Sequence, residues 1–154
     1  MEIKLNTNEQ VWIRGYEGIY SIRSDGQIRS HDRLVEYKDG RTKLLKGRWL
    51  KPGKDAQGYH LVLLYKDKQR TMYKVHRLVA EAFITNTDNL PVVNHKDKDV
   101  SNNDVSNLEW CSVQYNTEYS ISNCYKLVSP SGDLVEVVNL KKFCRDNNLN
   151  ASNL

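Results

Sequence analysis

The pattern of hydrophobic and polar positions along the chain predicts many short β-strands and few helices. In residues 12–30, Tyr20 and Ile22 alternate with polar neighbours, which is typical of a half-buried strand. Asp25-Gly26 follows and predicts a hairpin turn, because glycine tolerates the positive φ that such turns need. We expect the aromatic side chains of this unit to belong to its core; they are Trp12, Tyr16 and Tyr20.

Residues 58–75 predict a second hairpin that leads into a helix. Hydrophobic side chains occupy both sets of alternating positions from Tyr59 to Tyr65, so both faces of this hairpin are expected to be largely covered. His60 lies on its first strand and is expected to be a structural or surface residue. The apolar spacing over residues 76–83 predicts the helix. Its expected buried side consists of Leu78, Val79 and Phe83.

The stretch over residues 91–116 predicts a β-hairpin followed by a short helix. Residues that favour β-structure lead into Asn94-His95, and a loop rich in Asn, Asp and Ser follows, where side chains can bond the local backbone. A second short strand of sequence L-E-W-C comes next. Ser112 is placed to cap a helix that carries Asn116 one turn in. This arrangement is expected to bring His95 and Asn116 to one end of the unit.

The C-terminal segment predicts two strands, joined by a turn containing Pro and Gly, between residues 125 and 137. Asn139 is placed to cap a helix over residues 140–145. A further helix is expected to begin at Asn150 or Ser152.

The composition is that of a polar chain of 154 residues, long enough for one ordinary domain or a few small modules. Its mean hydropathy is −0.68, and no apolar run approaches the ~20 residues that a membrane span needs. The first residues do not resemble a signal peptide, which favours a cytosolic protein. Cys111, Cys124 and Cys144 are odd in number and far apart, so we expect free thiols and no zinc site.

The net charge of +4 is unevenly distributed. Residues 1–80 hold 17 Lys and Arg against 9 Asp and Glu, whereas residues 91–120 hold 2 against 5. A basic half followed by an acidic segment suits a protein that grips phosphates with one part and a cation with another.

The pairing of His95 with nearby amides points to hydrolysis of phosphodiesters. Neutral imidazole is available as a base at pH 7, since its unperturbed pKa is ~6.5. Hard cations prefer oxygen ligands, which Asn94 and Asn116 can offer as side-chain carbonyls. The alternative is that an Asn-rich loop with one histidine is only a surface hairpin, and spacing alone leaves both interpretations open.

The succession of H-R-L-V-A, N-H-x-D, N-N and N-L-E-W resembles the ββα-metal core of HNH endonucleases and the helix that introduces it in phage and intron-encoded homing endonucleases. His95, Asn107 and Asn116 stand at the positions of the three motif residues of that family. The N-terminal pattern G-Y-E-G-x-Y-x-I-x-S-x-G-x-I-R-S resembles the modular DNA-binding domain that precedes such cores. The C-terminal segment resembles the strand and helix-turn-helix module that follows them.

The resemblance implies an α+β modular protein with three parts. These are a β-rich DNA-binding domain over residues 1–72, an HNH core over residues 73–120, and a C-terminal DNA-binding module over residues 121–154 that is truncated where its recognition helix begins. It also implies a divalent-metal-dependent endonuclease of the homing type that acts on double-stranded DNA with Mg²⁺ or Mn²⁺ and without zinc.

The same resemblance implies a role for each motif residue. His95 is the general base, and Asn94 and Asn116 are oxygen ligands of the metal ion. Asn107 ties the loop to the backbone beside the catalytic group. His76 is expected to be hydrogen-bonded at the start of its helix, and it is the second catalytic candidate because it could approach the scissile phosphate.

Two positions depart from the usual pattern of the family. Related nicking enzymes have Asp where this chain has Asn94, and two neutral amides hold Mg²⁺ less tightly than a carboxylate does. We therefore expect DNA phosphates, Asp97 or Asp99 to supply negative charge. Lys98 stands where the family usually has glycine, a change that affects the loop backbone and removes no catalytic group.

Residues 38–54 form a run of cations broken by Gly and Pro. Such a run is often only a solvated loop, but beside an HNH signature we favour contact with phosphates. The candidate DNA-binding residues are Lys43, Lys46, Arg48, Lys51 and Lys54.

Functions of other classes stay open at this point. An HNH-derived protein that has lost activity would act by occupying DNA, and a weaker alternative is an RNA-binding β module. The expected partner is double-stranded DNA, and no association with a membrane is expected. We expect the protein to be a monomer or a weak dimer. One active site per chain predicts nicking by a monomer.

Overall fold

The structure is a computed structural model that describes residues 9–129 and 131–150. These residues fall into two compact units. The first takes in the chain up to Asn89 together with Val93–Trp110, and the second takes in Leu90–Val92 and the chain from Cys111 onward. Strands and three α-helices make up the described part, which agrees with an α+β fold. No helix in the described ranges is long and apolar enough to cross a membrane.

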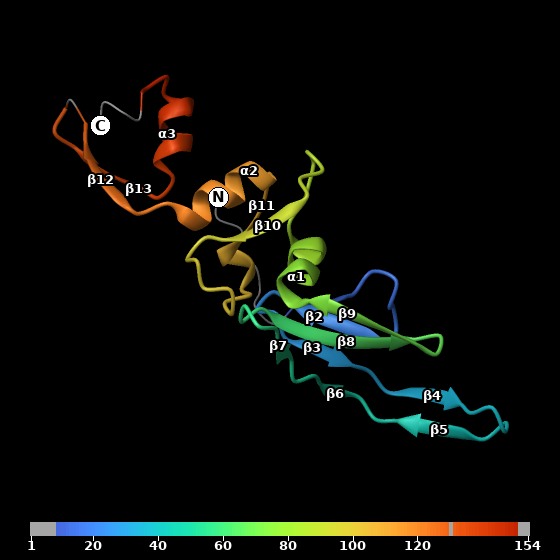
Figure 1. Cartoon of the computed structure of the whole chain (residues 1–154). Coiled ribbons are helices and arrows are strands. Elements are labelled where there is room, and N and C mark those ends of the chain that lie inside the picture. Colours follow the sequence, from blue (N-terminus) through green and yellow to red (C-terminus); the bar gives the residue numbers. More distant parts are fainter. Residues whose placement is uncertain (1–8, 130, 151–154) are drawn as a thin grey trace. The chain divides into compact units, whose positions relative to one another are not determined.

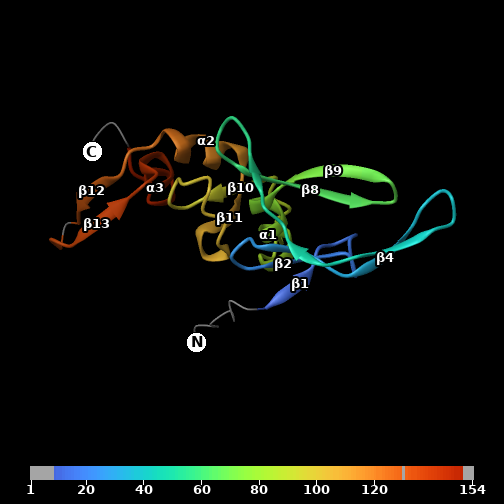
Figure 2. The same cartoon turned by 90° about the horizontal axis from the view of Figure 1, so that it is seen from below.

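The first unit begins with a four-stranded antiparallel sheet in the order β1-β2-β3-β6 (Figure 1). Its strands are β1 (Gln10–Trp12), β2 (Tyr20–Arg23), β3 (Ile28–Ser30) and β6 (Arg48–Trp49). Gly26 makes the β2–β3 turn with a φ of 84°, as the Asp-Gly pair predicts. A hairpin of β4 (Arg33–Glu36) and β5 (Thr42–Leu45) extends away from this sheet (Figure 2).

The second sheet of this unit has the order β7-β8-β9 and leads into α1. Its elements are β7 (Gly53–Lys54), β8 (His60–Lys66), β9 (Gln69–Lys74) and α1 (Val75–Phe83). The expectation that both faces of the hairpin are covered is wrong. Val62 and Leu64 are buried, whereas Leu63 and Tyr65 are 47% and 44% exposed, because only one face of the hairpin packs on the core.

A hydrophobic core joins the four-stranded sheet, β8, α1 and the hairpin after α1. Its most deeply buried large side chains are Ile22, Leu64, Val75 and Val79. Val93 and Leu108, from the strands that follow α1, belong to the same cluster. The N-terminal strands and most of the later hairpin are therefore held by one continuous apolar interior.

The expectation of three core aromatic residues holds for Tyr16 and Tyr20 and is wrong for Trp12. Trp12 is 48% exposed, and its ring lies 4.6 Å from that of His31. Val11 pairs with Ile22 in the β1–β2 register, so the next residue along β1 faces the opposite side of the sheet. Alternation therefore places Trp12 on the solvent face.

The hairpin after α1 is formed by β10 (Val92–His95) and β11 (Leu108–Cys111), which pair with each other. A short 3₁₀ turn, η1 (Val105–Asn107), leads into β11 and is capped by the side chain of Asp104. The indole N–H of Trp110 donates to the carbonyl of Ile84 at 3.0 Å, which fastens β11 to the end of α1.

The second unit consists of α2 (Val113–Ile121), the hairpin of β12 (Tyr125–Val128) and β13 (Leu134–Val137), and α3 (Leu140–Asp146). The predicted caps are confirmed: Ser112 accepts from the Tyr115 N–H, and Asn139 accepts from the Lys142 N–H. The further helix expected from Asn150 or Ser152 onward falls on residues 151–154, which lie outside the described residues.

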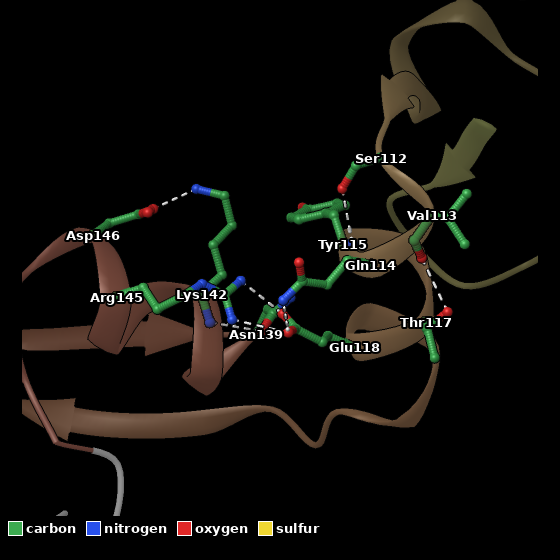
Figure 3. A network of polar contacts seen from close by, with 10 residues as sticks. All are labelled: Ser112, Val113, Gln114, Tyr115, Thr117, Glu118, Asn139, Lys142, Arg145 and Asp146. Carbon is green, nitrogen blue, oxygen red and sulfur yellow. Dashed lines mark hydrogen bonds and ion pairs between the residues drawn. The ribbon is translucent and has the colours of Figure 1, made fainter. Parts of the chain in front are cut away.

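Helices α2 and α3 are joined by an ion pair within the second unit (Figure 3). The guanidinium of Arg145 donates to both carboxylate oxygens of Glu118, each at 2.8 Å. The Gln114 amide donates to the same carboxylate at 3.0 Å. These bonds hold the pKa of Glu118 at about 2, with the contact to Arg145 as the largest cause.

Candidate active site

His95 is the last residue of β10, where the strand ends and the polar loop begins. Its side chain is 5% exposed because Tyr59 and His76 pack against it. Its ring centroid lies 5.0 Å from that of His76 and 5.9 Å from that of Tyr59. The helix α1, the start of β8 and the hairpin thus meet at this imidazole.

Burial keeps both histidines of this cluster in the neutral form. It is the largest cause that lowers the pKa of His76 to about 3, followed by the proximity of His95. Burial also lowers the pKa of His95, while the side chain of Asn103 and the charges of Asp97 and Asp99 act in the opposite direction. A neutral imidazole at pH 7 is the protonation state that a general base requires.

Asn94 lies beside His95 and is also buried, at 6% exposure. Its amide nitrogen donates to a carboxylate oxygen of Glu109, on the neighbouring strand, at 2.8 Å. With its N–H group engaged by Glu109, the amide offers its carbonyl oxygen as an acceptor. The pair therefore places a carboxylate directly beside Asn94, in addition to Asp97 and Asp99 of the loop.

Asn107 ties the polar loop together, in keeping with its expected structural role. Its amide nitrogen donates to Asp97 and to the Asn102 carbonyl, each at 2.9 Å, and its side-chain oxygen accepts from the Asp97 N–H at 3.0 Å. Asp99 is likewise used within the loop, because it accepts from the backbone N–H and the hydroxyl of Ser101. Both carboxylates bind the loop itself and contribute only their charge to His95.

Asn103 connects this loop to the N-terminal strands. Its side-chain nitrogen lies 3.0 Å from Nδ1 of His60 on β8 and donates to the Ser101 carbonyl at 3.0 Å. Asn103 is 6% exposed and packs against the β2–β3 turn, where a Cβ added at Gly26 would come within 3.0 Å of its own Cβ. The β2–β3 turn therefore has to carry glycine at this position.

Asn116 lies on α2, in the second unit, where its backbone N–H donates to the Ser112 carbonyl at 3.0 Å. His95, Asn94 and Asn107 belong to the first unit. The structure therefore brings these three together, and the convergence of Asn116 with them stays a prediction.

The expected phosphate-binding cations lie on the exposed surface of the first unit. Lys43 is on β5, Arg48 on β6 and Lys54 on β7, and Lys51 lies between the last two strands. Lys46 pairs with Asp32 at 3.4 Å. Their contact with phosphates stays a prediction.

An aromatic residue stands among these cations. Trp49 is 44% exposed, and the guanidinium carbons of Arg23 and Arg29 lie 5.9 and 5.7 Å from its ring centroid. Arginines stacked on an exposed indole form a surface suited to nucleic acid.

A hard divalent cation fits the donor atoms near His95. The carbonyl oxygen of Asn94 and the carboxylate of Glu109 are oxygen donors of the kind that Mg²⁺ and Mn²⁺ prefer. In the described ranges, no group of three or more His, Cys, Asp and Glu side chains is arranged to hold a metal ion. A cation bound here would need further ligands from amides, water or DNA phosphates.

Three residues of this region were not singled out from the sequence: Tyr59, Asn103 and Glu109. Glu109 lies two positions after Asn107, and a cross-strand pairing of the two predicted strands could have placed it opposite Asn94. Tyr59 and Asn103 carried no such signal, because their contacts join segments that are far apart in the sequence.

A buried histidine at the end of a short β-hairpin, with an asparagine tying its loop, defines a nuclease core of the HNH class. The family model described as HNH endonuclease matches residues 73–118 of this chain. The model of the NUMOD4 motif matches residues 11–65. The chain belongs to the HNH endonuclease family, as its relation to a phage enzyme also shows.

That phage enzyme is the DNA endonuclease I-HmuI of Bacillus phage SP01, which is 33% identical over 129 residues, or 84% of this chain and 67% of the relative. A solved structure that describes DNA binding and cleavage by the HNH homing endonuclease I-HmuI is similar to this chain. The two superpose with a TM-score of 0.57 and are 28% identical in sequence. The match covers 94% of this chain and 86% of the other.

A viral relative is longer. An uncharacterized HNH endonuclease of Acanthamoeba polyphaga mimivirus is 38% identical over 101 residues, which make up 65% of this chain. The matched part is 31% of the viral protein, so the chain spans about a third of that relative's length.

Proposed function

We propose that the protein is a divalent-metal-dependent endonuclease that hydrolyses phosphodiester bonds of double-stranded DNA and acts at a specific site, as a homing enzyme does. The observation that carries this proposal is the buried, neutral His95 next to an Asn94 amide whose nitrogen is held by Glu109. Membership of the HNH family and the likeness to a phage DNA endonuclease support it.

His95 acts as the general base in this proposal. Its neutral imidazole takes a proton from the attacking water, a contribution typically worth ~10²–10⁴-fold in rate. The rings of Tyr59 and His76 pack against it and restrict its orientation. His76 has a pKa of about 3 and is neutral at pH 7, so we assign it a packing role and keep it as the second catalytic candidate.

Asn94 and Asn116 would hold the metal ion through their side-chain oxygens, and Glu109 would add negative charge beside Asn94. When bound, Mg²⁺ or Mn²⁺ supplies Lewis-acid stabilisation of the charge that develops on phosphate oxygens. The role of Asn116 rests on its place in the matched family region, residues 73–118.

The remaining parts of the chain bind DNA in this proposal. Residues 1–72 form the basic DNA-binding domain, residues 73–120 form the nuclease core, and residues 121–154 form a C-terminal DNA-binding module. Phosphate contacts are assigned to the exposed cations Lys43, Lys46, Arg48, Lys51 and Lys54. Because one chain carries one catalytic core, we propose that a monomer nicks a single strand.

Plasmid nicking tests the proposal. Supercoiled DNA that carries the target site is incubated with Mg²⁺ and either the wild type or His95→Ala, and DNA binding is measured in parallel. We expect the wild type to produce open circles, and His95→Ala to lose at least ~10²-fold in rate while it still binds. His31→Ala is the matched control, since His31 bonds to Ser21 and contacts Trp12 in the N-terminal sheet.

Binding without cleavage by the wild type, with Mg²⁺ and with Mn²⁺, would contradict the enzymatic proposal and favour a protein that acts by occupying DNA. Equal rates for the wild type and His95→Ala would remove His95 from the chemistry.

A further inference from the structure

The outer face of the four-stranded sheet carries a row of side chains that runs across all of its strands. The strand register pairs Trp12 of β1 with Ser21 of β2, Ser21 with Arg29 of β3, and Arg29 with Trp49 of β6. Residues paired in this way lie on the same face of a sheet. Trp12 and Trp49 are 48% and 44% exposed. This face therefore presents an indole at each edge and a cation between them.

The opposite face of the same sheet packs on the core. Its side chains belong to the hydrophobic cluster of the first unit or pack against that cluster; they are Val11, Ile22, Ile28 and Leu50. Because side chains alternate along a strand, the burial of these residues fixes Trp12 and Trp49 on the solvent side. The exposure of the two indoles thus follows from the register of the whole sheet.

Arginine side chains lie beside one end of the row. The guanidinium carbons of Arg29 and Arg23 lie 5.7 and 5.9 Å from the ring centroid of Trp49. Arg23 also pairs with Asp25 at 3.2 Å, whereas Arg29 lies in the middle of the row. Positive charge next to an exposed indole matches a partner that has both phosphates and aromatic rings.

An open hollow of about 450 Å³ lies next to Trp49. Its lining includes the apolar side chains Leu50 and Leu63 and the cations Arg48 and Lys51. Its volume falls within the ~300–1,000 Å³ of sites that hold small ligands. Aromatic and apolar walls suit the flat ring of a base, and the two cations suit the phosphates that flank it.

The exposed indoles distinguish a single strand from a duplex. In a duplex, the bases stack on one another and present only their edges in the grooves, whereas unpaired bases offer their ring faces to aromatic side chains. Such stacking depends little on the nucleotide sequence. Cations alone would bind the phosphates of either form, so the two indoles are the feature that favours an unpaired strand.

We propose that the outer face of the four-stranded sheet binds single-stranded DNA, with one unpaired base stacked on Trp12, another on Trp49, and Arg29 in contact with the phosphates between them. Neighbouring strands are about 4.8 Å apart, so three steps separate the two indole positions by about 14 Å, a span of a few nucleotides. The choice of DNA rests on the proposed nuclease function, because a nicked duplex can open to an unpaired strand. The stacking surface does not depend on that function.

Indole fluorescence measures the stacking directly. The full chain is titrated, without a divalent metal, with a labelled oligothymidine of about 12 nucleotides, a length typical of single-strand binding sites. We expect binding to quench the indole emission, because a stacked base quenches the ring beneath it. The double change of Trp12 and Trp49 to Phe should keep most of the binding, followed by anisotropy, and abolish the quenching. Trp110 is then the only tryptophan left, and its N–H is bonded to Ile84.

Alanine variants measure how much each indole contributes. Trp12→Ala and Trp49→Ala should each weaken binding of the single strand roughly 5–150-fold, the loss expected for one stacked base. Binding of a duplex of the same length should be unchanged, since its bases have no free ring face. Tyr65→Ala is the matched control, because Tyr65 is also 44% exposed but lies on β8, in the other sheet of the first unit.

The proposal is overturned if the wild type does not bind the oligothymidine, if it binds without quenching, or if both alanine variants bind as the wild type does. The wild-type and Phe titrations decide the matter even if an alanine variant does not fold. An equal loss of duplex binding, or tighter binding of RNA than of DNA of the same length, would also contradict it. Absence of plasmid nicking together with quenching that depends on Trp12 and Trp49 would remove the nuclease function and keep the stacking surface.

Discussion

The imidazole of His76 shows what burial does to a single titratable side chain. Its own Nδ1 is buried without a partner, and its pKa falls to about 3. A charged ring at this place would face His95, Lys74 and Arg77, all of which oppose a further positive charge. Protonation of the His76 ring is therefore unfavourable in the folded state.

This depressed pKa predicts that the folded state loses stability in mild acid. The unfolded chain takes up a proton near pH 6.5, whereas folded His76 does so only near pH 3. The stabilising contribution is thus present above pH 6.5 and is lost as the pH falls from 6.5 toward 3. One such group changes the free energy of unfolding by at most ~1.4 kcal/mol per pH unit. Denaturant unfolding at pH 7.5, 6 and 5 measures it.

His76→Leu should reduce this pH dependence, since it removes one of the two histidines whose pKa burial lowers. Val79→Ala is the control, because Val79 is fully buried in α1 and its truncation lowers stability without changing the titrating groups. A slope that is the same in the wild type and His76→Leu would show that another group governs the acid sensitivity.

Lys98 is a second case in which a single residue shapes the site. It has a φ of 65°, and its N–H donates to the carbonyl of His95 at 3.1 Å. This left-handed conformation favours glycine, the residue that the family usually has here. Lys98 adopts the left-handed backbone conformation that glycine adopts easily. The turn after the proposed base therefore has the conformation expected for glycine at this position.

At the scale of elements, α2 depends on α3 for its anchoring. The two salt-bridged hydrogen bonds between Arg145 and Glu118 join the helix that carries Asn116 to the C-terminal hairpin unit (Figure 3). Among its described residues, the second unit has four buried hydrophobic side chains: Cys111, Tyr119, Val137 and Cys144. With so few buried contacts, a bidentate pair has an unusually large share in holding these elements together.

Arg145→Ala should loosen α3 from α2. We expect faster amide hydrogen exchange in α3 and in the β12–β13 hairpin, with the core of the first unit unchanged. Lys142→Ala is the matched control, because Lys142 pairs with Asp146 inside α3 and does not reach α2. Since Glu118 has a pKa of about 2, the wild-type pair should persist at pH 4 and weaken only as the pH falls toward 2. Equal exchange in both variants would contradict this anchoring role.

At the scale of the whole molecule, the basic residues and the buried apolar residues are distributed differently along the chain. Most of the basic residues lie in the first half of the chain, and they include Lys43 on β5, Arg48 on β6 and Lys54 on β7. The apolar core of the first unit extends from Ile13 to Leu108 in β11. The surface expected to meet DNA and the hairpin that carries His95 are therefore parts of one packed body.

Salt dependence tests the expected DNA surface. If Lys51 and Lys54 each contact a phosphate, the double change of both to Ala should reduce the slope of log K against log[salt] by about 1.8, at ~0.9 for each contact. Arg41→Ala is the control, because the Arg41 guanidinium is already paired with Asp39 in the β4–β5 hairpin. An unchanged slope in the double variant would exclude these two residues from the phosphate contacts.

The sequence by itself determined the elements that depend on near neighbours. Ser112 and Asn139 cap the predicted helices, and the strand of Leu108–Cys111 lies where its apolar pattern placed it. Caps and turns are bonds between residues a few positions apart, so the order of residues is enough to specify them. The motif residues of the HNH core were identifiable for a related reason, since each has a fixed place within one short segment.

Only the tertiary structure decided which surfaces are covered and what surrounds the proposed base. Trp12 has a large aromatic side chain that is typical of a core, yet the β1–β2 register places it on the solvent face. Glu109 reaches Asn94 from the neighbouring strand, and Asn103 meets His60 across 43 positions of the chain. Such contacts arise when distant segments pack together, because burial and pairing depend on three-dimensional neighbours that no local pattern of residues encodes.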